Sequence, residues 1–111
     1  MQVRITKYIL SILILSVGNV VYAANATVKI NAIIPDYMPD QIRFTVDANI
    51  GGCVSGTWLD RFGSGTDEST KRENNKIAYS TLLAALMAGK RVNVFVDEST
   101  CQVTNLQLSS Q

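Results

Sequence analysis

Apolar and polar residues alternate with a period of two in five short stretches of the chain: 28–34, 42–46, 53–59, 92–96 and 101–108. This period is typical of a strand that buries one face and exposes the other. The third stretch would place Val54 and Trp58 on one face. In the last stretch the alternation slips between Val103 and Leu106, which indicates a β-bulge. The pattern therefore predicts a mainly β protein of five strands.

A helix is predicted between the third and fourth strands. Residues 77–88 are apolar apart from two hydroxyl residues, and Asn74 or Asn75 can cap the first turn. Gly89 suits the left-handed position that ends a helix. The polar, Gly/Ser/Thr-rich stretch 61–75 before the helix predicts a long surface loop.

The predicted helix has two apolar faces, which is unusual for a small domain. One face comprises Ala78, Leu82, Ala85 and Leu86, and the other comprises Ile77, Ala84, Met87 and Ala88. Either the helix is central in a wrapped sheet and its small residues meet water, or the second face packs against other copies of the chain. Self-association makes four residues candidate interface residues: Ile77, Ala84, Met87 and Phe95. Phe95 faces away from the neighbouring valines, so it can alternatively cover the other side of the sheet.

The first residues are typical of a removable export signal. Arg4 and Lys7 precede an apolar run over 8–21, and Val21-Tyr22-Ala23 fits a signal peptidase site, with Ala24-Asn25-Ala26 as a second site. The alternative is an uncleaved membrane anchor, but the run is shorter than the ~20 residues that a bilayer requires. We therefore predict a signal peptide over 1–23, a single domain over 24–111, and a periplasmic or secreted protein that does not insert in the membrane.

The chain has two cysteines, Cys53 and Cys101. Export exposes both thiols to an oxidising compartment, and an even number with none left over predicts one disulfide. A disulfide closing a loop of this length stabilises a domain by about 4 kcal/mol in the chain-entropy model. The alternative is a reduced protein with two free thiols.

Charge and composition argue against several classes of function. Removing Arg4 and Lys7 from the ten basic residues leaves eight against nine acidic ones, so no nucleic-acid partner is expected. The chain has no histidine, and its adjacent carboxylates at 67–68 and 97–98 lie in polar stretches where solvated side chains are the rule. We expect no catalytic residue, no metal site and no cofactor, so binding remains as the function.

Four residues are candidates for ligand binding: Tyr37, Trp58, Arg61 and Phe62. Trp58, Arg61 and Phe62 lie where a predicted strand meets the polar loop, and Tyr37 lies in a loop bracketed by prolines. Aromatic faces beside small polar groups are suited to a sugar or a peptide. The alternative for Trp58 is a packing role in the core or at its rim.

Residues 78–90, the strand 92–96 and the Cys101 region resemble a family of small exported bacterial proteins. That family is similar to the binding subunits of pentameric AB toxins of the subtilase-cytotoxin and typhoid-toxin kind. The resemblance implies an OB-like five-stranded barrel with one helix before the fourth strand, a disulfide, and self-association, with five helices lining a pore. It also implies recognition of glycans, although no sugar-contacting residue of the toxins can be matched here. The alternative is a stand-alone periplasmic structural or interaction protein that has the same fold and no sugar site.

Overall fold

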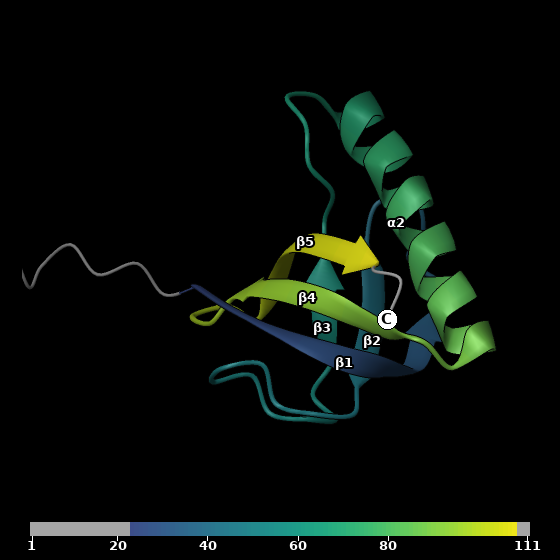
Figure 1. The fold of residues 1–111 in the computed structure, drawn as a ribbon. Helices are drawn as coiled ribbons and strands as arrows, with labels where there is room; N and C mark the ends of the chain where they lie inside the picture. The colour runs from purple at the N-terminus through teal and green to yellow at the C-terminus, as the bar shows by residue number, and fades with distance from the viewer. Residues whose placement is uncertain (1–22, 109–111) are drawn as a thin grey trace, which may run out of the picture.

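The structure, a computed structural model, describes residues 23–108 (Figure 1). Its elements are β1 (Ala23–Ile34), β2 (Ile42–Val46), β3 (Leu59–Arg61), α2 (Glu68–Ala88), β4 (Arg91–Asp97) and β5 (Gln102–Leu108). Apart from Ala23, which begins β1, the predicted signal peptide lies outside the described residues. Within residues 23–108 no helix is long and apolar enough to cross a membrane.

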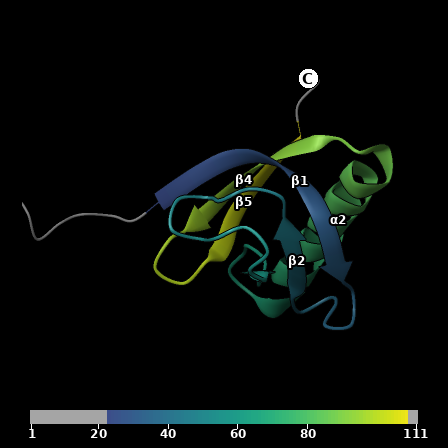
Figure 2. The ribbon, with the colours of Figure 1, turned by 90° about the horizontal axis from the view of Figure 1, so that it is seen from below.

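The five strands close into a ring in the order β1-β2-β3-β5-β4. Neighbouring strands are antiparallel except β3 and β5, which are parallel. β1 pairs with both β2 and β4, and Figures 1 and 2 show it as the long curved strand that joins them. One helix precedes β4. The predicted fold class, mainly β with an OB-like strand arrangement, is confirmed.

Two β-bulges shape the ring. In β5, Phe95 pairs with Asn105 and Val96 with Val103, so Thr104 is the extra residue of the predicted bulge. A second irregularity, between Ile30 and Ala32, marks the point where β1 pairs with β2. The bulge reverses the alternation, so Ala32 is exposed and the predicted buried set of the first strand ends at Ile30.

The third predicted strand was wrong in its extent. β3 begins only at Leu59, because Ile50 and Cys53 form a tight bridge that turns the chain after β2. Val54 then lies in a loop with 61% of its surface exposed, and Trp58 is also exposed, so these two side chains share no buried face.

The helix begins at Glu68, because its cap is Asp67, seven or eight residues before the predicted cap at Asn74 or Asn75. Asp67 caps it, with Oδ1 accepting a hydrogen bond from the backbone N–H of Thr70 at 2.7 Å. Asn75 is not a cap. It is buried and donates from Nδ2 to the carbonyl oxygens of Pro39 and Asp40, which fixes α2 against the β1–β2 loop. Much of the long loop predicted for 61–75 is therefore helical. The sequence pattern did not reveal these first turns, because they are polar on all sides and give no apolar stripe.

The end of the helix and its buried face agree with the predictions. Gly89 adopts the left-handed conformation, and its N–H bonds to the carbonyl of Leu86. Ala78, Leu82 and Ala85 are buried, and Leu86 packs partly against the core. They belong to one hydrophobic core with the fully buried strand residues Val28, Ile42, Phe44, Leu59, Val92 and Val94.

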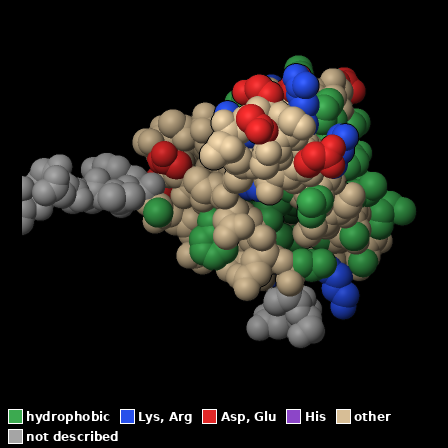
Figure 3. Space-filling view, turned by 90° about the horizontal axis from the view of Figure 1, so that it is seen from above, with side chains coloured by type: hydrophobic (Ala, Val, Ile, Leu, Met, Phe, Trp, Pro, Cys, Tyr) green, Lys and Arg blue, Asp and Glu red, His purple; other side chains and the backbone are tan. Residues whose placement is uncertain are grey.

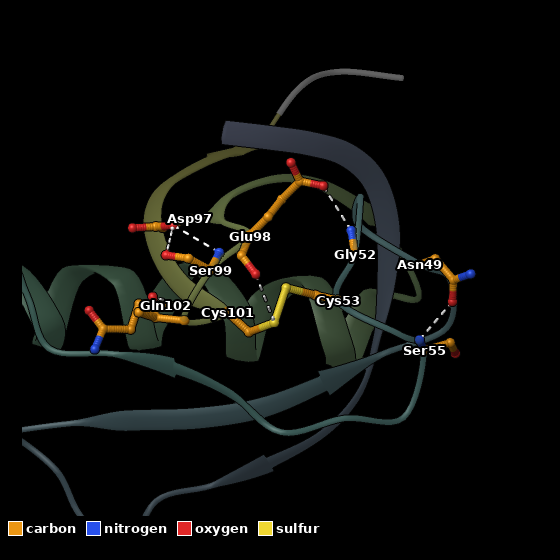
Figure 4. Close-up of a disulfide and its surroundings, with 10 residues drawn as sticks. Asn49, Gly52, Cys53, Ser55, Asp97, Glu98, Ser99, Cys101 and Gln102 are labelled. Carbon is orange, nitrogen blue, oxygen red and sulfur yellow. Dashed lines mark hydrogen bonds between the residues drawn. A yellow bond between two sulfur atoms is a disulfide. The ribbon is translucent and has the colours of Figure 1, made fainter. Parts of the chain in front are cut away.

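The predicted disulfide is present between Cys53 and Cys101. It joins the β2–β3 connection to the turn between β4 and β5 (Figure 4). Beside it, the N–H of Gly52 donates to Glu98 Oε1 at 2.8 Å. Gly51 has φ of +55°, and a side chain there would collide with the same carboxylate, so this close approach of two loops requires glycine.

Candidate functional site

Asp60 organises a polar network on the solvent side of β2 and β3. Alternation along β3 buries Leu59 and leaves Asp60 on the opposite face, directly across from Arg43 of β2. Asp60 Oδ1 accepts from Arg43 Nε at 2.7 Å and from Gln41 Nε2 at 2.9 Å. The side chain of Arg43 is 33% exposed and that of Asp60 27%, so water and ligands can still reach both.

Three exposed aromatic side chains accompany this network. Tyr37 of the β1–β2 loop lies with its ring centroid 5.9 Å from Arg43 Cζ, a cation–π distance. Trp58 and Phe62 are also exposed and lie in the chain directly before and directly after β3. We use the name β2–β3 outer face for the polar residues Gln41, Arg43 and Asp60 together with the aromatic residues Tyr37, Trp58 and Phe62.

Arg61 does not belong to the β2–β3 outer face. Its alternation directs it to the other side of β3, where it is 94% buried, with a relative exposure of 6%. There it lines a pocket of about 160 Å³ between β3, α2 and β5. The structure therefore connects Tyr37 to the polar network of β2 and β3 and separates Arg61 from it.

Arg43, Gln41 and Asp60 were missed by the sequence analysis. Arg43 and Asp60 are 17 residues apart, and they meet only because β2 and β3 pair in one particular register. Arg43 lies in one predicted strand and Asp60 directly follows the next, but these opposite charges identify no pair until the register of the two strands is known.

The second apolar face of the helix is exposed, as its separation from the first face suggested. Ile77 is 68% exposed and Met87 82%, and Ala84 and Leu83 are also exposed. These four residues define the outer face of α2. In Figure 3 hydrophobic side chains gather on the side of the molecule where α2 lies.

Phe95 is not part of the outer face of α2. It is half-buried on β4, between its cross-strand neighbours Asn25 of β1 and Asn105 of β5. Of the predicted interface residues, the structure thus groups Ile77, Ala84 and Met87 on one element and places Phe95 on another.

The two adjacent acidic pairs have structural partners. Asp67 caps α2, and its hydrogen bond from the Thr70 N–H lowers the pKa of the Asp67 carboxyl. A hydrogen bond from the Ser99 hydroxyl likewise lowers the pKa of Asp97, in the turn that Figure 4 shows beside the disulfide. Within residues 23–108 no three His, Cys, Asp or Glu side chains come together in a way that could hold a metal ion.

No protein-family model, no curated protein and no solved structure matches the chain. The resemblance to toxin binding subunits stays a prediction from the sequence, and the candidate site rests on its geometry.

Proposed function

We propose that the chain is an exported, non-enzymatic binding module that recognises a glycan through the β2–β3 outer face. The observation that carries this proposal is the arrangement of Tyr37, Arg43 and Asp60, with Trp58 and Phe62 alongside. In OB-type folds the face of the second and third strands and the loop between the first two strands are the usual place for ligands, including oligosaccharides. Tyr37 lies in that loop and the charged pair lies on those strands.

The chemistry of this face suits a sugar better than a polyanion. Exposed aromatic rings can cover the apolar face of a sugar ring, while a guanidinium, a carboxylate and an amide offer donors and acceptors for its hydroxyl groups. Nucleic acid, the other common ligand of OB-type folds, is disfavoured because the chain without Arg4 and Lys7 has eight basic and nine acidic residues.

Self-association through the outer face of α2 completes the proposal. No charged residue lies between Lys76 and Lys90, so a second copy can cover Ile77, Ala84 and Met87 without burying a charge. A ring of copies, a pentamer in the toxin analogy, would present several glycan sites at once. Several weak sites acting together bind a cell surface far more tightly than one.

Glycan-array binding by the oxidised protein tests the proposal. We expect Trp58→Ala and Tyr37→Ala to lower binding at least about tenfold, because each loses an aromatic contact worth on the order of 1 kcal/mol or more at every occupied site. Val54→Ala is the matched control, since Val54 is an exposed apolar residue of the same β2–β3 connection that lies outside the outer face. Absence of any bound glycan, with the oligomer intact, would contradict a sugar-binding role.

A second candidate function is a stand-alone periplasmic structural or interaction protein. It is favoured by one observation: the Asp60 carboxylate already accepts hydrogen bonds from Arg43 and Gln41, so its charge has a partner without a ligand. Light scattering that finds a monomer would favour this alternative. A neighbouring gene for an exported toxin enzyme would count against it.

A further inference from the structure

Arg61 is a buried cation without a counter-charge. None of the ion pairs within residues 23–108 includes it, and its Nε has no hydrogen-bond partner among them. Its one hydrogen bond joins Nη2 to Asn74 Oδ1 at 2.5 Å. Burial lowers the pKa of the guanidinium, but arginine stays protonated in proteins, so the charge remains. A buried charge without a partner is destabilising until an anion approaches it.

The pocket beside Arg61 has room for such an anion. It combines polar groups with an apolar wall, and its lining consists of Arg61, Asn74, Ile77, Ala78, Thr81, Asn105 and Leu106. Asn105 Oδ1 accepts from the N–H of Leu106, which leaves the amide protons of Asn105 available to an acceptor. Asn74 holds Arg61 in position, since the same oxygen also accepts from the N–H of Ser64.

We propose that this pocket binds a small carboxylate that carries a short apolar group. The terminal nitrogens of the planar guanidinium can donate to a carboxylate in a forked arrangement. Ile77, Ala78 and Leu106 offer an apolar wall to the rest of the ligand. A single cation with one amide suits one negative charge, whereas phosphate with its higher charge is usually held by several cations or backbone N–H groups.

The site is separate from the proposed glycan face. Asp60 and Arg61 are adjacent residues of β3 and lie on its two opposite faces, so the carboxylate pocket opens beside α2 and not beside Tyr37. Failure of glycan binding therefore leaves the carboxylate proposal standing, and the reverse also holds.

Nuclear magnetic resonance of the oxidised protein tests the proposal directly. The probe is sodium butyrate, with butanamide as the uncharged analogue of the same shape and sodium chloride added to equal ionic strength. We expect butyrate to shift the Arg61 Nε–H and Asn105 side-chain signals in a saturable way below about 10 mM. Butanamide should leave them in place, because it offers no negative charge to the guanidinium.

Variants assign the effect to Arg61. Arg61→Gln should weaken butyrate binding at least tenfold, and Arg61→Lys should weaken it less, because lysine keeps the charge but lacks the forked donor geometry. Ser80→Ala is the matched control on the same helix, outside the pocket lining. The exposed Ser80 hydroxyl donates to the Lys76 carbonyl at 3.1 Å, so its loss should leave butyrate binding unchanged. Thermal melts supply a second readout: butyrate should raise the Tm of the wild type and not that of Arg61→Gln.

Any of four results with added ligands would overturn the proposal. They are equal responses to butyrate and butanamide, undiminished binding by Arg61→Gln, preference for inorganic phosphate over butyrate, and no response up to about 10 mM butyrate. A shift of the Arg61 Nε–H signal with protein concentration alone would show that another copy supplies the carboxylate, which equally overturns a free ligand.

Discussion

Arg43 and Arg61 lie on neighbouring strands and have opposite surroundings. Arg43 points to solvent, forms an ion pair with Asp60 and stacks near Tyr37. Arg61, which pairs in register with Ile42 next to Arg43, is buried and bonds only to the neutral Asn74 among the described residues. Within residues 23–108, arginine thus has an acidic partner on one face of these strands and lacks one on the other. The face without an acidic partner is where a bound anion contributes most, because desolvation has already occurred.

The largest expected effect on stability comes from removing the disulfide, which should affect both faces of β3. β3 carries both Asp60 and Arg61 and lies inside the 48-residue loop that the disulfide closes. The Cys53→Ser/Cys101→Ser variant should lower the free energy of unfolding by about 4 kcal/mol, as measured by urea denaturation. Amide hydrogen exchange at both Asp60 and Arg61 should be faster in this variant than in the wild type. Faster exchange at only one of these two amides would show that the faces are not coupled through β3.

The second prediction separates the two arginines. Arg43→Met should lower the free energy of unfolding by about 1–2 kcal/mol, because Asp60 loses a charge-assisted hydrogen bond on a partly exposed face. Arg61→Met should raise it by on the order of 1 kcal/mol, because an apolar side chain replaces an unpaired buried charge. Urea denaturation of both variants without added carboxylate gives the comparison. A larger decrease in the free energy of unfolding for Arg61→Met than for Arg43→Met would contradict this prediction.

The third prediction concerns the outer face of α2. Ala84 is exposed in the protomer, so Ala84→Glu should dissociate the oligomer while changing protomer stability by less than about 0.5 kcal/mol. Ala85 is the matched control one residue along, because it is buried and its change to Glu should unfold the domain. Light scattering and circular dichroism distinguish the two results. A wild-type protein that is already monomeric would refute self-association.

The smallest effect is expected at Asp67, which begins the helix that forms one wall of the Arg61 pocket. Its pKa is lowered in the folded protein, so its contribution to stability is full above the ordinary carboxyl pKa of about 4 and declines as the pH falls through the lowered value. Asp67→Asn keeps a capping oxygen but loses the charge. The difference in Tm between wild type and variant should therefore narrow below about pH 4, and a constant difference would contradict the assignment.

Local patterns in the sequence predicted much of the fold. The alternation of valines over 92–96, the slip before Leu106 and the buried stripe of Ala78, Leu82 and Ala85 all follow from short-range periodicity. Counting cysteines was sufficient for the disulfide, because two cysteines allow only one pairing within a chain.

The first turns of α2 and the candidate sites could not be predicted in this way. Residues 68–75 form a helix supported by its Asp67 cap and by the ion pair between Glu68 and Lys71, with little apolar patterning to reveal it. Asp60 and Arg61 are adjacent in the sequence, yet their separation onto two faces depends on where β3 begins. The Arg43–Asp60 pair depends on cross-strand register, which a single sequence does not specify.

The position of the two cysteines also sets the order in which the molecule can be completed. Cys53 leaves the ribosome 48 residues ahead of Cys101, an interval of about 2–10 s at ordinary rates of synthesis. During that interval the chain holds a single thiol, and β4, the second partner of β1, emerges only shortly before Cys101. Each nascent copy therefore passes through a stage in which its lone thiol can react with another molecule and one edge of β1 is unpaired. Pairing of β1 with β4 and formation of the disulfide then remove the unpaired edge and the free thiol. Both steps depend on the same short final segment of the chain.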